Sequence, residues 1–434
     1  MLRKPASKWL TGMSKRWIFF ILTILLVVIS SCVSLRRGTR QMTTLSLYNP
    51  GQTTIHPEFT IYHHSDTESS LFFRLLSSEL LFNQANPQMK DQARVRLSYV
   101  LYASLANNEV AARDTQSFVF DRDIVGEQVI GSVKIPTERG KTYLIDVRLD
   151  DVLRNTTYRD YVLADRFSEF PQQDYLLLTY PGNRVSFQRY FYADEHFRIL
   201  KKNTQINQIY ISIFSPRDVL PLPPYSVDTP LDLAPLPDST ISVSWSEQQL
   251  FRLGQPGIYV FHDDPSRSRG LGLAQFGDRY PQIRAPEDML LPLQYLMTRE
   301  EYADIIQNAD IKRAVDDFWL NKGKTMANAR DLIRVYYNRV TFANIYFASS
   351  RQGWQTDRGM IFLIMGPPSV VEKSETREVW KYEMAETEQT YRFDFDLADD
   401  YWMGYDYSLK RSEEHRTIWN RAVESWRKGK IFSL

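Results

Sequence analysis

Apolar and polar residues alternate with a period of two over much of the first part of the chain, from residue 43 to residue 165. In residues 93–105, and again in residues 141–152, every second side chain is apolar and the side chains between them are mostly polar. This alternation predicts strands with one buried face. Several short strands at this spacing, separated by turn-forming pairs such as Asn107-Asn108, predict an antiparallel, immunoglobulin-like β-sandwich over residues 43–165.

A second β-rich stretch covers residues 170–264 and predicts a second β-sandwich. A proline-rich insertion, residues 216–237, interrupts it with seven prolines. Proline fixes φ and removes a backbone donor, so we expect this insertion to be extended and unpaired. We interpret it as a long loop laid over a sheet. The alternative is a polyproline-II segment that binds a partner.

The apolar period changes to about 3.6 after a predicted linker at residues 265–296. Leu332, Tyr336 and Val340 recur at every fourth position, and a final helix is expected at residues 413–428. Strand patterns lie between these helices, so residues 297–434 predict an α+β domain. The predicted fold class is therefore multidomain and mainly β, with antiparallel sandwich modules followed by helices and a small antiparallel sheet.

The N-terminus has the composition of an export signal. Basic residues precede an apolar stretch at residues 17–29, and small residues and Cys32 follow it. A membrane-spanning helix needs about 20 apolar residues, so we expect a cleaved signal peptide at residues 1–31 rather than a retained anchor. The sequence Ile-Ser-Ser-Cys at residues 29–32 resembles the lipobox of bacterial lipoproteins. That resemblance implies that Cys32 is lipidated and that residues 32–42 form a tether.

The residues after Cys32 bear on location. They lack the acidic cluster that resembles a surface-export tag, and no Asp follows Cys32 to resemble an inner-membrane retention signal. Both absences favour the periplasmic face of the outer membrane. Cys32 is the only cysteine, so we expect no intrachain disulfide. The formal net charge of +1 gives no whole-chain field that would favour nucleic acid as a partner.

Residues 353–368, GWQTDRGMIFLIMGPP, combine turn-forming, charged and apolar positions. Gly353 is expected to end the preceding helix in a left-handed conformation. The apolar run at residues 360–365 predicts a strand buried on both faces, which Gly366 and two prolines end. Residues 377–383 predict its hairpin partner.

These residues resemble the GWxTD domain of bacterial lipoproteins and secreted proteins, best known in Bacteroidetes. The resemblance covers about residues 318–407. It implies lineage and location, and no reaction. We interpret the motif as structural, with ligand or partner binding as an alternative and catalysis as a weaker one. The matching positions are Gly353, Trp354, Thr356, Asp357, Arg358, Gly359, Gly366, Pro367 and Trp380.

Other candidate sites are incomplete in the sequence. Asp394 and Asp396 alternate with apolar residues, as in a half-solvated strand, and the stretch does not match an EF-hand loop. His63 and His64 are adjacent, so on a strand they point to opposite faces; we expect exposed histidines at a strand end rather than a metal site. The stretch at residues 321–325 lacks the first glycine of a phosphate-binding loop.

We therefore expect a non-catalytic scaffold or accessory subunit of a cell-envelope protein complex, with the membrane and envelope proteins as partners and no cofactor or metal. This expectation rests on architecture alone. One alternative is an envelope hydrolase that uses Asp357 or the Asp394 and Asp396 strand, with or without calcium. Another is a glycan or peptide binder that uses exposed aromatic residues at Tyr401, Trp402 and Tyr405.

Overall fold

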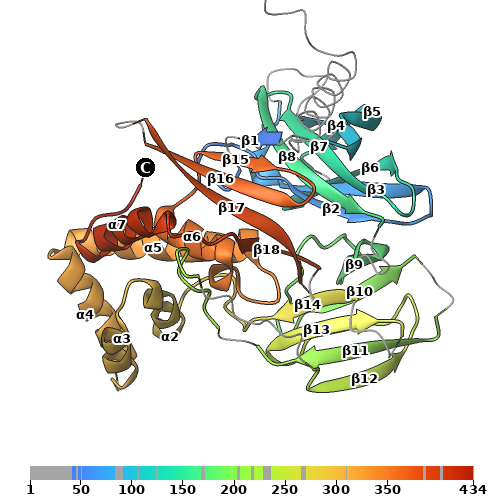
Figure 1. Cartoon of the computed structure of the whole chain (residues 1–434). Helices are drawn as coiled ribbons and strands as arrows, with labels where there is room; N and C mark the ends of the chain where they lie inside the picture. The colour runs from blue at the N-terminus through green and yellow to red at the C-terminus, as the bar shows by residue number, and fades with distance from the viewer. Residues whose placement is uncertain are drawn as a thin grey trace, which may run out of the picture. The chain divides into compact units, whose positions relative to one another are not determined.

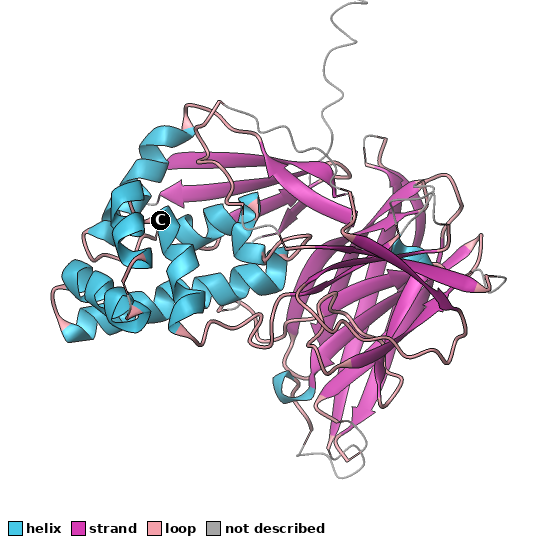
Figure 2. Ribbon diagram, turned by 90° about the horizontal axis from the view of Figure 1, so that it is seen from below, coloured by secondary structure: helices cyan, strands magenta, loops and turns pink. Residues whose placement is uncertain are grey.

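The computed structural model describes residues 42–44, 47–49, 51–83, 91–105, 107–123, 126–167, 172–202, 206–216, 219–227, 236–264, 270–308, 310–384, 388–400 and 404–433. The predicted signal peptide and Cys32 lie outside these residues. Within them, no helix is both long and apolar enough to cross a membrane. Strands in antiparallel sheets dominate, and the α-helices of the described ranges belong to the C-terminal part of the chain (Figure 2). The prediction of a mainly β, multidomain fold with a C-terminal α+β region is confirmed.

The first sandwich consists of two antiparallel sheets, with strand orders β2-β3-β6 and β5-β4-β7-β8 (Figure 1). Both sheets contribute to one core, which includes Phe73 from β3, Leu97 from β4 and Ile145 from β7. The period-two segments of the sequence are found in β4 and β7. The bounds are β2 (Glu58–Tyr62), β3 (Glu68–Leu76), η1 (Ser77–Glu79), β4 (Gln92–Ser104), β5 (Glu109–Asp121), β6 (Gln128–Pro136), β7 (Thr142–Asp151) and β8 (Thr156–Asp165).

The second sandwich places a two-stranded sheet, β9-β10, against a four-stranded sheet of order β12-β11-β13-β14. Phe197 of β10 and Phe261 of β13 meet in the core between them, with ring centroids 6.1 Å apart. Strand β14 falls inside the segment predicted to be a linker, because it pairs with β13 and completes the larger sheet. The bounds are η3 (Gln172–Asp174), β9 (Tyr175–Tyr180), β10 (His196–Lys201), β11 (Gln208–Phe214), β12 (Ser239–Ser244), β13 (Gly257–His262) and β14 (Leu271–Gln275).

Helices follow, and side-chain caps start several of them. Thr298 caps α3 and Thr325 caps α5, each by accepting an N–H bond from the third residue along. Leu290 and Leu293 of the predicted linker belong to the C-terminal core, so residues 286–296 are part of this region. The bounds are α2 (Pro286–Leu290), η4 (Leu291–Tyr295), α3 (Arg299–Ile306), α4 (Ile311–Gly323), α5 (Met326–Phe347), η5 (Gly353–Gln355), α6 (Asp357–Met365) and α7 (His415–Arg427).

The C-terminal sheet is antiparallel, with order β1-β15-β16-β17-β18. Its first strand comes from the other end of the chain: Met42 pairs with Lys373, and Thr44 with Val371. Residues 43 and 44, predicted to start the first sandwich, therefore belong to this sheet. Leu47 is buried in the same core as Trp380. The bounds are β1 (Met42–Thr44), β15 (Val370–Lys373), β16 (Arg377–Met384), β17 (Gln389–Asp400) and β18 (Gly404–Leu409).

The apolar run at residues 360–365 forms helix α6, so the prediction of a strand is wrong. Every residue from Arg358 to Met365 is buried in this helix. An apolar run covered on all sides has no polar face, and therefore carries no period that separates helix from strand. The hairpin partner of β16 is β15, with Val371 opposite Trp380. Gly353 does not adopt a positive φ, and the preceding helix ends at Phe347.

Candidate functional site

The motif residues form the turn η5 and the first turn of α6. The side chain of Thr356 caps α6, because its Oγ1 accepts the N–H of Gly359 at 3.0 Å. The same hydroxyl donates to the carbonyl oxygen of Gly353 at 2.7 Å. Thr356 is almost fully buried, so both bonds replace water that the hydroxyl cannot reach. Thr356 therefore fixes the direction in which α6 leaves the turn.

Two motif glycines allow close backbone approaches. A Cβ atom on Gly353 would lie 1.9 Å from the carbonyl oxygen of Ala343 in α5. A Cβ atom on Gly359 would lie 1.8 Å from the carbonyl oxygen of Gly353. Real Cβ atoms do not approach backbone oxygens this closely, so any side chain at either position forces the backbones apart. The glycines let the turn lie directly against α5 and let α6 lie directly against the turn.

Trp354 is buried, and its polar groups are bonded locally. Its backbone N–H donates to Oδ1 of Asn344 at 3.3 Å, and its Nε1 donates to Oε1 of Gln352 at 3.0 Å. Its carbonyl oxygen accepts the hydroxyl of Tyr295 at 3.0 Å, and the two rings meet edge to face at 6.0 Å. Trp354 thus joins the turn to α5 and η4. With 2% of its surface exposed, it offers no open ring face to a ligand.

Asp357 pairs with Arg411, which follows β18. Nη2 of Arg411 lies 2.5 Å from Oδ1 of Asp357, and Nη1 lies 3.2 Å from Oδ2. The backbone N–H of Leu409 also donates to Oδ2, at 2.8 Å. A carboxylate at the first residue of α6 also suits the positive end of the helix dipole. Both oxygens of Asp357 therefore have internal partners.

The proline-rich insertion meets the same ion pair. Nη2 of Arg411 donates to the carbonyl oxygen of Leu222 at 3.1 Å. The carbonyl oxygen of Pro224 accepts from the N–H of Ser412 at 3.0 Å and lies 3.0 Å from Nδ1 of His415. Arg416 stacks on Tyr225 at 4.1 Å. Residues 219–227 contain no strand, as predicted. They contact Ser412 and the first residues of α7.

Arg358 pairs with Glu378, a carboxylate that is not among the matching motif positions. Its Nη1 lies 3.3 Å from Oε2 of Glu378, which is fully buried in β16. Trp380, another matching position, donates its Nε1 to the other oxygen of Glu378 at 2.6 Å. Arg358 also lies over the ring of Tyr407, 4.3 Å from its centroid. Burial by itself lowers the pKa of Arg358. The negative charge of Glu378, together with other nearby groups, raises it by more, so the net pKa of Arg358 is raised.

The end of α6 is held by a buried arginine in α5. Gly366 has φ of 88°, which favours glycine, and a Cβ there would lie 2.8 Å from Nη2 of Arg339. Arg339 donates to the carbonyl oxygens of Leu363, Ile364 and Phe432. Burial lowers the pKa of Arg339 to about 10, so it stays charged at neutral pH. Pro367 follows, half-buried, and ends the helix.

Sequence reasoning missed Arg339, Glu378 and Arg411. Signals existed for two of them. Arg339 follows the apolar position Tyr336 by three residues in α5, and Glu378 shares a strand face with Trp380. A charge on an apolar face indicates a buried ionic contact. Arg411 had no such signal, because it lies in the loop between β18 and α7, where no helix or strand periodicity assigns a residue to a face.

The other predicted candidates do not converge into a site. Asp394 pairs with Arg392 and Asp396 with Arg377, each at 2.6 Å, while Phe393 and Phe395 are buried on the opposite face of β17. Among the described residues no three His, Cys, Asp or Glu side chains are grouped to hold a metal. Residues 321–325 end α4 and cap α5. Tyr401 and Trp402, and the side chain of Tyr405, lie outside the described residues.

His63 is buried, so the prediction that both histidines are exposed is wrong for it. Its Nε2 donates to the carbonyl oxygen of Asp165 at 2.9 Å, and its Nδ1 lies 2.6 Å from the hydroxyl of Ser69. Burial lowers the pKa of His63 to about 4, so at neutral pH the ring is neutral, Nε2 carries the proton and Nδ1 accepts from Ser69. His64 instead bonds the carboxylate of Glu68 at 2.8 Å. The two rings have separate partners, which contradicts a shared metal site.

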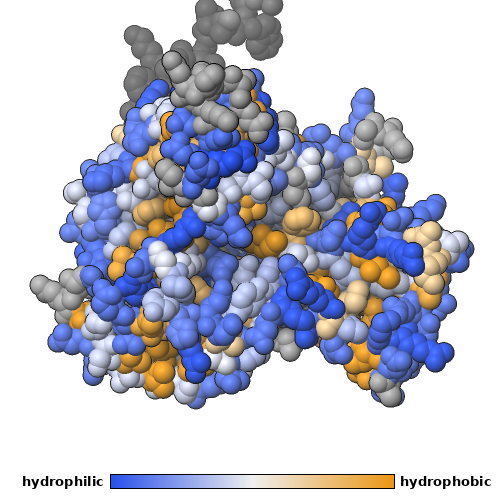
Figure 3. Space-filling view, turned by 180° about the vertical axis from the view of Figure 1, so that it is seen from behind, coloured by the Kyte–Doolittle hydropathy of each residue, from blue (hydrophilic) through white to orange (hydrophobic). Residues whose placement is uncertain are grey.

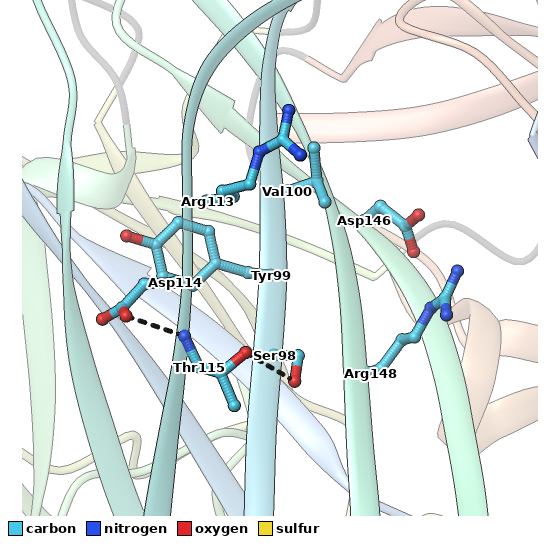
Figure 4. A pocket seen from close by; sticks show the side chains of 8 residues that line it. All are labelled: Ser98, Tyr99, Val100, Arg113, Asp114, Thr115, Asp146 and Arg148. Atoms are coloured by element: carbon cyan, nitrogen blue, oxygen red, sulfur yellow. Dashed lines mark hydrogen bonds between the residues drawn. The ribbon is translucent and has the colours of Figure 1, made fainter.

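A cavity of about 290 Å³ opens on the first sandwich, over β4, β5 and β7 (Figure 4). Thr115 of β5 donates to the hydroxyl of its cross-strand neighbour Ser98 in β4 at 3.0 Å. Asp146 beside it is held by Arg159 in two bonds of 2.7 and 2.6 Å. The cavity shares no residue with the motif. Its lining is Ser98, Tyr99, Val100, Arg113, Asp114, Thr115, Asp146 and Arg148.

Comparison with known proteins identifies the C-terminal part of the chain. No curated protein matches the sequence. The model of the GWxTD domain family matches residues 257–428. This range includes β13, β14, the helices α2 to α7 and the sheet strands β15 to β18, and every motif residue described above. The chain therefore carries a GWxTD domain over residues 257–428.

Proposed function

We propose that this protein is a lipid-anchored outer-membrane component on the periplasmic side, and that it acts as a non-catalytic scaffold or accessory subunit of a cell-envelope protein complex. The anchor rests on the export-signal composition and on the lipobox resemblance at Cys32. The partners would be envelope proteins, in export, secretion or outer-membrane assembly. The GWxTD domain would serve as a rigid support for the surfaces that contact them.

One observation carries the non-catalytic part of the proposal: the charged motif groups are used internally. Asp357 is engaged by Arg411 and by the N–H of Leu409. Arg358 is buried against Glu378. A general base or nucleophile needs a free lone pair facing substrate, and an anion holder needs a free guanidinium edge. Breaking these pairs to release a catalytic group would leave buried charges without partners.

The hydrolase alternative has less support. It would need carboxylates that are free to take part in catalysis. Asp394 and Asp396 lie on the solvent face of a strand and pair with neighbouring arginines, and Asp146 at the cavity of the first sandwich is held by Arg159. The face of the molecule in Figure 3 shows apolar residues in small groups among polar ones, as on ordinary globular surfaces. The pairing of these carboxylates with arginines therefore favours the scaffold proposal over turnover of a substrate.

The test is recovery of partners from native membranes. The full chain is expressed with an affinity tag on a flexible C-terminal linker, because Phe432 is buried and bonded to Arg339. Detergent-solubilised membranes are then purified and the recovered proteins quantified. We expect stoichiometric envelope proteins, with recovery reduced in a Cys32→Ala variant that lacks the anchor. Recovery of this protein alone and monodisperse in both cases would contradict the scaffold proposal.

A further inference from the structure

Strand β12 is an edge strand that is exposed on both faces. It pairs with β11 on one side, with Ile211 opposite Ile241. Residues 239–242 and Ser244 are exposed and Val243 is half-buried. Its sequence, Ser-Thr-Ile-Ser-Val-Ser, contains no charged residue and no proline. An uncharged, exposed edge of this kind offers a row of backbone donors and acceptors to another strand.

Two other sheet edges in the described structure, β14 and β5, are protected. The opposite edge of the same sheet, β14, is buried and bonded: Ala274 exchanges backbone hydrogen bonds with Arg189 and Phe191 at 2.9 and 3.0 Å. The long edge strand β5 carries charges at Glu109, Arg113 and Asp114. Charged residues and covering segments are the usual means of preventing edge-to-edge pairing. Their absence from β12 indicates an edge that is covered in the working state.

The apolar face of β12 supports the same conclusion. The second sandwich opposes four strands with only two, β9 and β10. Ile211 is buried on the inner face of the larger sheet, and its cross-strand neighbour Ile241 lies on that face too, beyond the cover of the smaller sheet. Ile241 is consequently 48% exposed. A strand added to this edge would extend the inner face and shield this side chain.

We propose that β12 pairs in an antiparallel manner with β12 of a second copy of this chain, with a two-fold axis at Ile241. In this register Ile241 faces Ile241 of the second copy, Thr240 faces Ser242, and Ser239 faces Val243. Ile241, Val243 and Ser239 then share the inner face, and the hydroxyls of Thr240, Ser242 and Ser244 share the outer face. No charge meets a like charge, because the strand has none. The two four-stranded sheets become one continuous sheet.

This contact is small compared with a standard interface of about 1,600 Å². The dimer is therefore weak in dilute solution and depends on concentration. Confinement to a membrane raises the effective concentration of two anchored copies. The pairing itself does not depend on the proposed scaffold function, and a failed partner pull-down leaves it unaffected.

Cysteine cross-linking tests the register. Directly opposed residues in an antiparallel pair have Cβ atoms about 5 Å apart, within reach of a short bifunctional thiol reagent. In the full chain, Ile241→Cys gives a covalent dimer as the major product. Thr240→Cys alone does not, but a mixture of Thr240→Cys and Ser242→Cys chains does. The wild-type chain controls for Cys32, and Val119→Cys controls for exposure, because Val119 is 52% exposed on the charged edge β5.

A second variant tests the association without cross-linking. Ile241→Lys places a charge at the centre of the edge and should shift the sedimentation profile of concentrated protein from dimer to monomer. Ile241 is half exposed, so the thermal midpoint should match wild type and show that folding is intact. Absence of cross-linking at position 241, equal cross-linking at position 119, or cross-linking of Ile241→Cys to a different membrane protein would overturn the proposal.

Discussion

The carboxylate of Asp357 and the guanidinium of Arg411 form a two-point ion pair that ties the first turn of α6 to the segment between β18 and α7. The two residues are 54 positions apart in the chain. Arg411 also holds the carbonyl oxygen of Leu222 in the proline-rich insertion. The most polar position of the motif is therefore a structural connection between three segments. This role leads directly to the first prediction.

Replacing Asp357 with Asn should destabilise the protein without creating a steric clash. Asn keeps the size of the side chain and one oxygen for the N–H of Leu409, but it loses the charge that balances Arg411. The pair is mostly buried, with 11% and 19% of the side chains exposed. We expect the free energy of unfolding to fall by about 2–3 kcal/mol, measured by chemical denaturation. The matched control is Asp396→Asn, whose pair with Arg377 is exposed and should cost less than about 1 kcal/mol.

The pair of Arg358 and Glu378 should show strong coupling. Arg358→Met leaves Glu378 buried without its charge partner, and we expect a loss of about 3–5 kcal/mol in unfolding free energy. Adding Glu378→Gln removes the unpaired buried charge, while the Gln oxygen still accepts from Nε1 of Trp380. The double variant should recover most of the loss. A double-mutant cycle measures the coupling, and strictly additive losses would show that the two side chains do not act as a pair.

Gly353→Ala should disrupt the turn. The added Cβ would lie 1.9 Å from a backbone oxygen of α5, so helix and turn must separate. We expect a loss of at least about 2 kcal/mol, seen as a lower thermal midpoint. Gly254→Ala is the control, because no atom lies within 4 Å of the position that a Cβ atom would take there. It should leave stability unchanged or raise it by up to about 1 kcal/mol. Equal midpoints for the two variants would refute the close approach.

Stability should fall between pH 6.5 and pH 4 because of His63. Burial lowers the pKa of His63 to about 4, and the positive charge of Arg166 adds to the effect. The unfolded chain binds the proton near pH 6.5, whereas the folded chain excludes it until about pH 4. The contribution is complete above pH 6.5 and decreases by up to about 3 kcal/mol across this window.

The measurement is unfolding free energy as a function of pH. His63→Asn should flatten the slope between pH 6.5 and pH 4, although its stability at neutral pH will be lower. His196→Asn, at an exposed position of β10, should keep the wild-type slope. An unchanged slope in His63→Asn would assign the acid sensitivity to other groups.

The sandwich strands and the long helices were determined by the sequence alone. Alternation with a period of two fixes which side of a strand is buried, and the segments at residues 93–105 and 141–152 appear as β4 and β7. The apolar stripe of α5, formed by Leu332, Tyr336 and Val340, faces the C-terminal core. Motif residues 353–359 lie together in η5 and the first turn of α6, because they are adjacent in the chain.

Tertiary structure decided what local pattern does not encode. The run at residues 360–365 became a helix because α6 is covered on every side, and no polar face remained to reveal its period. The motif's partners, Arg411 and Glu378, come from distant segments whose distances are set only when the chain folds. Strand β1 joined β15 across more than 300 residues, since strand pairing depends on which edges meet in space. Sequence determines the faces of the elements, and packing determines which faces and edges meet.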